Sequence, residues 1–374
     1  MRTVTPQIHF ILSIILTLRR SLTCFIAYFC PTANSFNPIR MLKIGVLGAG
    51  HLGKIHLKCI QLANTVYDLA GFYDPNPDHA RAAAEQFGVR AFPDAESLMD
   101  AVDVIDIVTP TITHFELARQ AIEKGKHVFI EKPLTHTLEE AESLIRMSQS
   151  KGVKVQVGHV ERFNPALLAL GDMPLAPMFV EAHRLAAFNP RGTDVSVILD
   201  LMIHDLDIIL SMVDSPVKHV DASGVAVVSE TPDIANARIE FENGCVANLT
   251  ASRISLKQMR KVRLFQRNAY ISLDFLEKKA QVVRLFEPGD PSIAGMDNLL
   301  ELPTSKGAKR LHIDSPAIEP GNAIQMELET FAGSILDQTR PRVDIEDGYQ
   351  ALKLAYRIIE SIDEKLVANQ PLLP

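Results

Sequence analysis

The sequence predicts an α/β protein: an N-terminal doubly wound parallel sheet, followed by an α+β domain with an open, mainly antiparallel sheet. Apolar strands alternate with amphipathic helices after Met41, which favours a parallel sheet because parallel strands need crossover connections. Short strands follow one another later in the chain, separated by tight turns such as Glu242–Gly244, which favours antiparallel pairing. The 374 residues also exceed the size at which one core usually keeps growing, so two domains are expected.

The first half of the chain supplies the parallel sheet. Five apolar segments are predicted as strands: Lys43–Leu47, Leu69–Tyr73, Val104–Val108, His127–Ile130 and Lys154–Val157. Four segments between them are predicted as helices: His51–Ala63, Pro77–Phe87, His114–Lys124 and Leu138–Lys151. Right-handed crossovers bring the carboxyl ends of parallel strands to one edge, where ligands bind. Five residues that follow strands should converge there: Gly48, Asp74, Thr109, Glu131 and Gly158.

A glycine-rich turn, Gly48-Ala49-Gly50-His51-Leu52-Gly53, joins the first strand to the first helix. Gly48 makes the tight turn, Gly50 lets the backbone approach a pyrophosphate, and Gly53 lets the helix pack closely on the strand. The free N–H groups at the helix N-terminus, where His51 and Leu52 lie, would face the phosphates. Because the motif lies between a strand and a helix, it predicts a dinucleotide site rather than a chance glycine loop.

Asp74 ends the second predicted strand, about 20 residues after Gly53, which is the spacing of a ribose-binding acid. Its carboxylate would accept hydrogen bonds from a 2′-hydroxyl and repel a 2′-phosphate. No arginine directly follows Asp74, so the sequence favours NAD over NADP as the cofactor. The alternative is that Asp74 only opens the turn Asp74-Pro75-Asn76-Pro77.

Composition narrows the classes of partner. A net charge of -7 argues against nucleic acid, and the basic segment Lys257–Arg263 is predicted to be a solvated strand face. The cysteines form no CxxC pair, and His56 near Cys59 lacks the further ligands that a metal site needs. We therefore expect no metal and a reducing, cytoplasmic compartment.

The first 40 residues differ from the rest of the chain. Apolar runs at Ile8–Leu18 and Leu22–Cys30 flank Arg19-Arg20, and neither reaches the roughly 18–20 residues of a membrane span. A twin-arginine export signal cleaved near Ser35 is one interpretation. We favour an upstream extension attached to a wrongly assigned start, because Met41 directly precedes the first strand.

In the second half of the chain the hydrophobic pattern changes from alternating strands and helices to a run of short strands. An apolar helix is predicted at Val197–Val213, a loop at Pro288–Asn322, and closing helices at Ala323–Gln338 and Glu346–Lys365. Six strands are predicted between them: Val220–Val228, Asn236–Phe241, Cys245–Ala251, Val262–Phe265, Ala269–Leu273 and Gln281–Leu285. We divide the chain into an extension (1–40), a dinucleotide-binding domain (41–160), and a substrate and oligomerisation domain (161–374) whose last helices return toward the first.

Polar clusters capable of chemistry lie at the ligand edge or face it: Glu131-Lys132-Pro133, Gly158–Pro165 and Asp200–Asp205. Asp200 and His204 are neighbours on one face of a helix, and a buried carboxylate beside an imidazole raises its basicity, as a general base requires. Each cluster also has a structural interpretation. Asp200 and His204 could be a core pair, and Lys132 could be simply solvated. Arg162 could merely neutralise Glu161.

From Met41 onward the chain resembles the glucose-fructose oxidoreductase and inositol dehydrogenase family. The matching residues are Gly48, Gly50 and Gly53; Thr109-Pro110 with His114; Glu131-Lys132-Pro133; Gly158 with Arg162–Pro165; Asp200 with His204; and Glu346–Leu352. The resemblance implies a nicotinamide-dependent sugar or polyol oxidoreductase with a Rossmann domain and an open sheet that makes homodimer or homotetramer contacts. Thr109, His114, Glu131 and Lys132 would then belong to the NAD site.

The resemblance also implies a role for each catalytic residue. Lys132 would hydrogen-bond the reacting hydroxyl and stabilise alkoxide charge, His204 would take the proton, and Asp200 would orient and tune His204. A cis peptide bond between Lys132 and Pro133 is expected. Because fold alone does not decide function, an NAD-binding redox sensor without turnover and an oligomeric scaffold are the alternatives.

Substrate identity depends on a narrower resemblance. Gly158–Ala166 and Arg191–Asp194 resemble family members that act on nucleotide-activated amino sugars, such as UDP-N-acetylglucosamine 3-dehydrogenases. This implies oxidation at C3 of a UDP-N-acetylhexosamine, with inositol, a simple sugar or another polyol as the alternative. The implied substrate-binding residues are His159, Arg162, Asn164 and Arg191. Arg162, Arg184 and Arg191 could meet a diphosphate bidentately.

Overall fold

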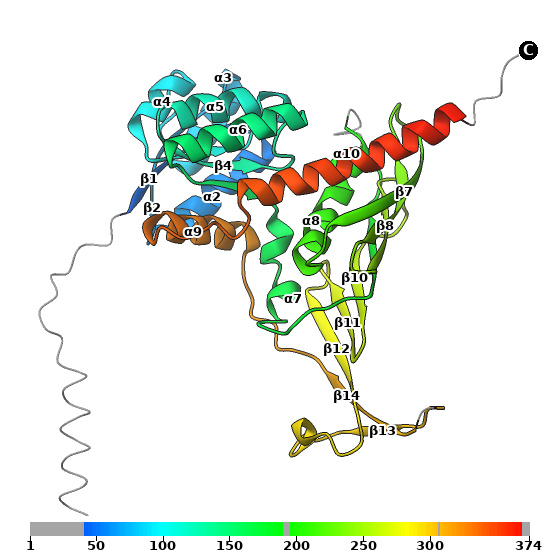
Figure 1. The fold of residues 1–374 in the computed structure, drawn as a ribbon. Helices are drawn as coiled ribbons and strands as arrows, with labels where there is room; N and C mark the ends of the chain where they lie inside the picture. The colour runs from blue at the N-terminus through cyan, green and yellow to red at the C-terminus, as the bar shows by residue number, and fades with distance from the viewer. Residues whose placement is uncertain (1–40, 190–194, 306, 369–374) are drawn as a thin grey trace, which may run out of the picture. The chain divides into compact units, whose positions relative to one another are not determined.

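The computed structural model describes residues 41–189, 195–305 and 307–368, so the expectations for the first 40 residues and for Arg191 lie outside it. Its first sheet has five parallel strands in the order β2-β1-β3-β4-β5 (Figure 1). These strands are β1 (Leu42–Leu47), β2 (Tyr67–Tyr73), β3 (Val104–Ile107), β4 (His127–Glu131) and β5 (Val155–Gly158). The predicted parallel sheet is confirmed, strand by strand.

Helices cover both faces of this sheet. They are α2 (His51–Leu62), α3 (Pro77–Phe87), α4 (Ala95–Ala101), α5 (His114–Glu123) and α6 (Leu138–Lys151). Buried side chains of α2 pack on one face, and those of α4, α5 and α6 pack on the other. Four of these helices were predicted. α4 was not, because it is only seven residues long and too short to show a clear helical period.

The end of the chain completes the core of the first sheet. α9 (Ala323–Leu336) packs beside α2, and the Tyr67 hydroxyl donates to the Leu328 carbonyl at 3.0 Å. α10 (Ile345–Ala368) begins against β5, where a Cβ on Gly348 would lie 2.6 Å from the Val157 side chain. Figure 1 shows α10 running from the first sheet across to the second.

The second sheet has nine strands in the order β13-β14-β12-β11-β10-β6-β9-β8-β7. The strands are β6 (Phe179–Leu185), β7 (Val217–Val225), β8 (Ile234–Phe241), β9 (Val246–Ser252), β10 (Met259–Gln266), β11 (Ala269–Asp274), β12 (Lys279–Phe286), β13 (Leu300–Leu302) and β14 (Lys309–Asp314). Among their recorded pairings only β6 with β9 is parallel, so the predicted mainly antiparallel sheet is confirmed.

Two predictions about this half were wrong. β6 lies in the middle of the sheet but was missed, because Glu181, His183 and Arg184 interrupt its apolar pattern. β13 and β14 form within the segment predicted as a loop. β13 has three residues, all exposed, and such a strand leaves no hydrophobic alternation to detect.

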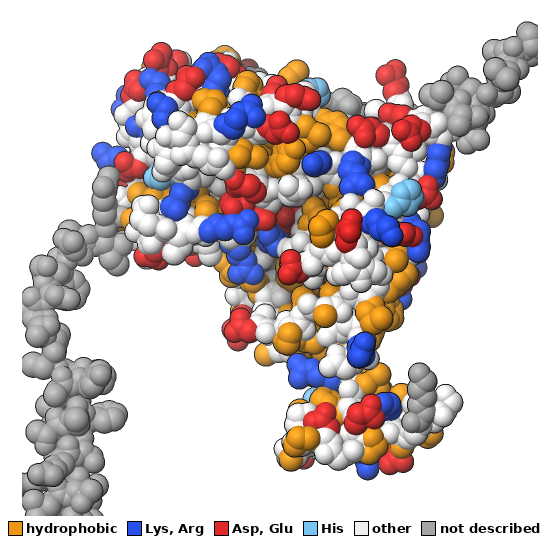
Figure 2. All heavy atoms as spheres, in the orientation of Figure 1, with side chains coloured by type: hydrophobic (Ala, Val, Ile, Leu, Met, Phe, Trp, Pro, Cys, Tyr) orange, Lys and Arg blue, Asp and Glu red, His pale blue; other side chains and the backbone are white. Residues whose placement is uncertain are grey.

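One face of the second sheet carries the core and the other is open. Alternate residues of β8, such as Ala237, Ile239 and Phe241, are buried in a cluster with residues of α8 (Ile203–Met212) and α10. Over the surface in view, acidic and basic side chains are interspersed (Figure 2).

Among the described residues, no helix is both long enough and apolar enough to span a membrane.

Candidate active site

The three glycines after β1 have distinct environments. Gly48 has a φ of +98°, and a Cβ there would lie 2.7 Å from the Val108 carbonyl oxygen. A Cβ on Gly53 would lie 2.1 Å from the Gly48 carbonyl oxygen, so only glycine allows α2 to start this close to β1. A Cβ on Gly50 would meet nothing within 4 Å. Gly48 and Gly53 are therefore required by the fold, whereas Gly50 faces open space.

The N-terminus of α2 is free to bind an anion. Gly50 is the N-cap residue and supplies no side-chain hydrogen bond to the first turn. The exposed residues His51 and Leu52 form that turn, as predicted, so their N–H groups point out of the helix end. Uncapped N–H groups and the positive end of the helix dipole suit a phosphate, and the space beside Gly50 admits one.

A cavity of about 610 Å³ adjoins the glycine turn and is lined by Gly48, Gly50, Asp74 and Thr109, among others. The Asp74 carboxylate accepts the Ala49 N–H at 2.6 Å and the Asn76 N–H at 2.8 Å. Asp74 therefore does open the predicted turn, and it lines the cavity as well. A mainly apolar cavity with the Asp74 carboxylate beside the glycine turn, next to a free helix N-terminus, fits the adenosine and pyrophosphate of a dinucleotide.

Two cofactor-site candidates have contacts that hold strand ends together. The His114 ring is buried, with Nδ1 2.9 Å from the Pro133 carbonyl oxygen and Nε2 2.9 Å from the Thr109 carbonyl oxygen. The Thr109 hydroxyl accepts a hydrogen bond from Thr113 at 2.7 Å. His114 thus joins the ends of β3 and β4, next to the cavity.

Lys132 lies at the end of β4, and its bond to Pro133 is cis, as expected. Its Nζ donates to the Asp200 backbone carbonyl at 2.7 Å and lies 3.5 Å from Asp200 Oδ1. Asp200 belongs to a π-helical turn, Ile198–Met202, that precedes α8. The predicted helix Val197–Val213 is thus irregular at its start, a feature that is frequent at functional sites.

The expected pairing of Asp200 with His204 was wrong. Among the described contacts, no hydrogen bond or ion pair joins these two side chains, because Asp200 faces Lys132 instead. The pKa of His204 is well below its usual value, first because of burial and then because of the positive charges of Lys132 and Arg184. The imidazole is therefore neutral at neutral pH, and the carboxylate that was expected to raise its basicity does not contact it.

His159, which follows β5, lies beside His204. The two rings are perpendicular, with centroids 6.5 Å apart. Both ring nitrogens of His159 are buried without a hydrogen-bond partner, as is Nδ1 of His204. Burial, followed by the charges of Arg162 and Lys132, lowers the pKa of His159 to about 3. His204 and His159 are thus neighbours, and the charge of Lys132 acts on both rings.

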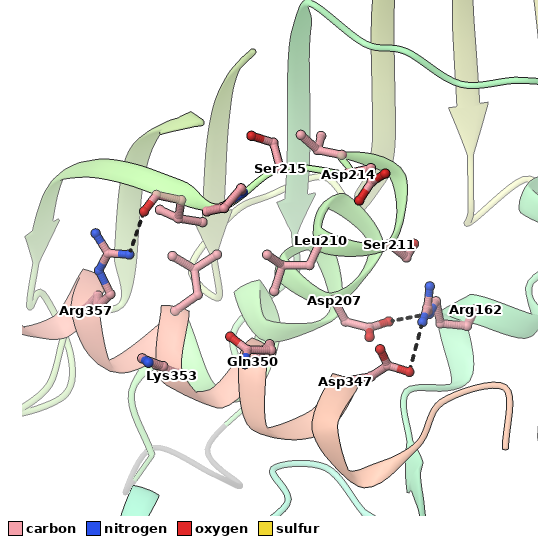
Figure 3. Close-up of a pocket in the computed structure, with 14 residues that line it drawn as sticks. Arg162, Asp207, Leu210, Ser211, Asp214, Ser215, Asp347, Gln350, Lys353 and Arg357 are labelled. Carbon is pink, nitrogen blue, oxygen red and sulfur yellow. Dashed lines mark hydrogen bonds and ion pairs between the residues drawn. The ribbon is translucent and has the colours of Figure 1, made fainter. Parts of the chain in front are cut away.

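Arg162 has different partners from the Glu161 carboxylate considered in the sequence analysis. Its guanidinium is 3.3 Å from Asp207 and 3.6 Å from Asp347, not paired with Glu161. These residues line one end of a pocket of about 740 Å³ between α8 and α10 (Figure 3). Burial raises the pKa of Asp207 to about 7, although Arg162 opposes this. Arg162 is thus already shared by two carboxyl groups.

Two further residues are already occupied by contacts within the protein. Arg184 is buried and lies 2.9 Å from both Glu161 and Asp205, which corrects the expectation that it could meet a diphosphate. Asn164 caps α7 (Pro165–Leu168) by accepting the Ala166 N–H, and its amide donates to Glu161 and to the Phe275 carbonyl. Its expected contact with substrate stays a prediction.

A buried polar cluster was missed by sequence reasoning. His56 has no further ligand nearby in the sequence, but in space its ring contacts Asp106 and Glu131, and Glu327 lies close by. These carboxyl groups come from β3, β4 and α9. One signal was available in the sequence, since Asp106 and Gln156 are polar residues inside otherwise apolar predicted strands.

Comparison with known proteins adds independent findings. Residues 42–159 match the family model GFO_IDH_MocA, described as an oxidoreductase family with an NAD-binding Rossmann fold. Residues 177–271 match a GFO/IDH/MocA C-terminal domain. A UDP-N-acetylglucosamine 3-dehydrogenase from Acidithiobacillus ferrooxidans is 36% identical over 86% of this chain and 97% of its own length. A myo-inositol 2-dehydrogenase from Thermotoga maritima is 26% identical over 87% of this chain and 97% of its own.

Solved structures give the same picture. The Acidithiobacillus UDP-N-acetylglucosamine 3-dehydrogenase has a TM-score of 0.77 at 34% identity and covers 87% of this chain and 99% of its own. A levoglucosan dehydrogenase in complex with NADH and levoglucosan has a TM-score of 0.74 at 20% identity, covering 87% and 98%, which shows a shared fold.

Proposed function

Because this chain belongs to the GFO/IDH/MocA family of NAD-binding oxidoreductases, we propose that it oxidises C3 of a UDP-linked N-acetylhexosamine to a 3-keto sugar. The observation that carries the proposal is the 36% identity, over nearly the whole of both chains, to a UDP-N-acetylglucosamine 3-dehydrogenase. The grouping of Lys132, Asp200 and His204 supports turnover, since a redox sensor has no use for a lysine and a neutral histidine side by side.

In the proposed reaction His204 is the general base. Its imidazole is neutral because burial and the nearby Lys132 charge lower its pKa, so a ring nitrogen is free to accept the hydroxyl proton. The Lys132 ammonium donates a hydrogen bond to the same hydroxyl and stabilises the developing alkoxide. Asp200 holds that ammonium through its backbone carbonyl and carboxylate. When bound, NAD supplies the acceptor for the hydride that leaves the carbon.

The glycine turn and Asp74 would hold NAD. The N–H groups of His51 and Leu52 would contact the pyrophosphate beside Gly50, and the Asp74 carboxylate would accept from the ribose hydroxyl. The 610 Å³ cavity would take the adenosine, and its carboxylate would disfavour a 2′-phosphate.

For the sugar, we retain His159, Arg162 and Asn164 as candidate contacts. His159 has two ring nitrogens without partners beside the proposed base, and these need a donor and an acceptor from elsewhere. Arg162 would have to exchange one of its carboxylates for a phosphate oxygen. Arg191 lies outside the described residues and stays a prediction from the sequence.

The test is NADH formation by the purified protein, measured side by side with UDP-N-acetylglucosamine, free N-acetylglucosamine, glucose and myo-inositol. We expect the highest kcat/KM with the nucleotide sugar, and a 3-keto product identifiable by NMR. Arg162→Ala should raise the KM for the nucleotide sugar more than it changes kcat, because a diphosphate contact is the same in ground and transition states. Faster reduction with a free sugar or inositol would replace the proposal with a polyol dehydrogenase.

We also propose that the enzyme works in the cytoplasm as a homodimer or homotetramer. The described cysteines, Cys59 and Cys245, are both free and buried, which suits a reducing compartment. Light scattering gives the oligomeric state.

A protein beginning at Met41 should be fully active. An N-terminus near Ser35 in protein recovered from outside the cytoplasm would instead favour export.

A further inference from the structure

A closed polar cluster lies in the core directly behind Lys132. Its members are His56 on α2, Asp106 on β3, Glu131 on β4 and Glu327 on α9. The His56 and Asp106 side chains are fully buried, the Glu131 side chain is 10% exposed, and Glu327 is fully buried. Nothing in the proposed chemistry uses this cluster, although Glu131 is the direct neighbour of Lys132.

His56 is held between two carboxyl groups. Its Nδ1 is 2.9 Å from Asp106 Oδ2, and its Nε2 is 3.1 Å from Glu131 Oε1. A neutral imidazole carries one N–H, so only an imidazolium donates to two carboxylates at once. Burial alone would lower the pKa of His56, but Asp106 and Glu131 raise it well above its usual value. The geometry and the charges thus agree on a doubly protonated ring.

Glu327 is the neutral member of the cluster. Both of its carboxyl oxygens are buried without a hydrogen-bond partner, and one of them lies within 4.8 Å of a ring nitrogen of His56 and a carboxylate oxygen of Glu131. Burial, followed by the charge of Glu131, raises the pKa of Glu327 well above its usual value. Because a buried charge without a partner costs free energy, a protonated, neutral Glu327 is more stable in this core than an ionised one.

Glu131 connects this cluster to Lys132. Its Oε2 accepts the backbone N–H of Lys132 at 3.2 Å, while Oε1 contacts His56. A Cβ on Gly158 would lie 2.8 Å from Glu131 Oε1, so the glycine leaves room for the carboxylate. Lys132 is therefore fixed at its backbone by Glu131 and at its ammonium by Asp200.

We propose that His56 is a positioning residue: its imidazolium, itself held by Asp106, locks the Glu131 carboxylate against the Lys132 amide, and so fixes Lys132 for hydride transfer. The inference rests on the proposed function only for the role of Lys132. A displacement of about 1 Å in a reacting group costs about 10²-fold in rate, which sets the size of the expected effect.

Two substitutions separate the two contacts of the ring. In His56→Asn the amide nitrogen takes the place of Nδ1 and reaches Asp106 only. In His56→Gln it takes the place of Nε2 and reaches Glu131 only. We expect His56→Asn to lower kcat by about 10²-fold with little change in the KM for sugar or NAD. His56→Gln should recover most of that loss, and equal kcat in the two variants would overturn the inference.

Glu327→Gln is the matched control, because the amide keeps the shape and the neutral charge that we assign to Glu327. It should keep kcat within about threefold of wild type, since a side chain that was already neutral loses no charge. A loss as large as that of His56→Asn would show that an ionised Glu327 is needed, which contradicts the arrangement.

The pH profile distinguishes positioning from general damage. Burial opposes the ionisation of Glu131, but His56 and Lys132 together hold its pKa below the usual value. The other ionisable groups facing Glu131 are Asp106, Glu327, His114 and His159. Without the imidazolium the pKa of Glu131 rises, so the acid limb of kcat in His56→Asn should move to higher pH. An unmoved limb with uniformly lower kcat would indicate a structural role only.

A measurement without turnover tests the charge of the ring. In the ¹⁵N spectrum of histidine-labelled protein free of substrate, His56 should show two N–H groups at pH 7.5. A single N–H would overturn the assignment, as would one equivalent of bound metal in the purified protein, because a metal would displace the proton on Nε2. The kinetic comparison uses whichever sugar reduces NAD, so rejection of the nucleotide sugar leaves the His56 test intact.

Discussion

Replacing Gly50 by valine should remove NAD binding without harming the fold. A Cβ at Gly50 meets nothing within 4 Å, and the backbone there is extended, with φ -66° and ψ -161°, so it does not need the left-handed region that favours glycine. Loss of the preferred glycine N-cap costs at most about 1 kcal/mol, and the stiffer unfolded chain offsets about 0.4–1 kcal/mol of it. We therefore expect the Tm to change by no more than about 3 °C.

The effect on NAD is much larger, because the valine side chain fills the space that the pyrophosphate needs. Each hydrogen bond to a charged group contributes about 1.5–3 kcal/mol. Losing the bonds from His51 and Leu52 would therefore cost about 3–6 kcal/mol, or about 10²- to 10⁴-fold in Kd. Isothermal titration with NAD and a thermal melt of the same sample measure both quantities.

Gly53→Ala is the contrasting variant in the same turn. Its Cβ would lie 2.1 Å from the Gly48 carbonyl oxygen, and backbone atoms must move to relieve the contact. We expect a cost near the top of the about 1–3 kcal/mol range of overpacking, and a Tm lower by roughly 6–12 °C. If Gly50→Val instead bound NAD like wild type, or melted as early as Gly53→Ala, the assignment of open space at Gly50 to the cofactor would be refuted.

Four further predictions follow from the site. Lys132→Ala and His204→Ala should each lower turnover by about 10²- to 10⁴-fold with NAD affinity unchanged in titrations; undiminished turnover in His204→Ala would make His159 the next candidate base. Asp74→Ser should bring the Kd values for NAD and NADP closer together. Wild-type protein that binds NADP as tightly as NAD would contradict the role of the Asp74 carboxylate. The pKa of His159 is lowered to about 3, so the unfolded chain binds a proton that the folded one does not as pH drops below about 6.5. Urea unfolding should therefore show stability falling by about 1.4 kcal/mol per pH unit from this group between pH 6 and 4, and His159→Asn should reduce that slope. Arg184→Met leaves the buried Asp205 carboxylate without its ion-pair partner and should cost about 3–5 kcal/mol; an unchanged Tm would show that Asp205 is solvated or protonated.

The sequence predicts the order of elements well wherever hydrophobic period decides the structure. The five parallel strands are mainly apolar, and their ends fall within a few residues of the expected positions. The second half is harder because its strands mix buried and exposed positions. β6 carries Arg184, which reads as a surface residue in the sequence but is buried by pairing with Asp205 from α8.

In the site, features set by neighbouring residues were predictable, whereas contacts between residues far apart in the sequence were not. The glycine turn and Asp74 follow from local spacing, and the structure has them in the expected geometry. The partner of Asp200 does not follow from spacing. Helical periodicity favours His204, but Lys132, at the end of β4, is the residue that contacts Asp200. Likewise Glu327 is far from Glu131 in the sequence, so no local pattern predicts that they share a core.

The return of α9 to the first sheet has a consequence for synthesis of the protein. α9 contributes Leu328, Phe331 and Ala332 to the core on one face of that sheet, and the Tyr67 hydroxyl bonds to a carbonyl 261 residues further on. At about 5–20 residues per second, a ribosome needs roughly 10–35 s to add the chain between β5 and the end of α9. During that interval this face of the sheet, Phe129 included, lacks the cover that α9 supplies. The cofactor-binding half is thus a unit in space and not along the chain, and its nascent form exposes apolar surface until the last helices arrive.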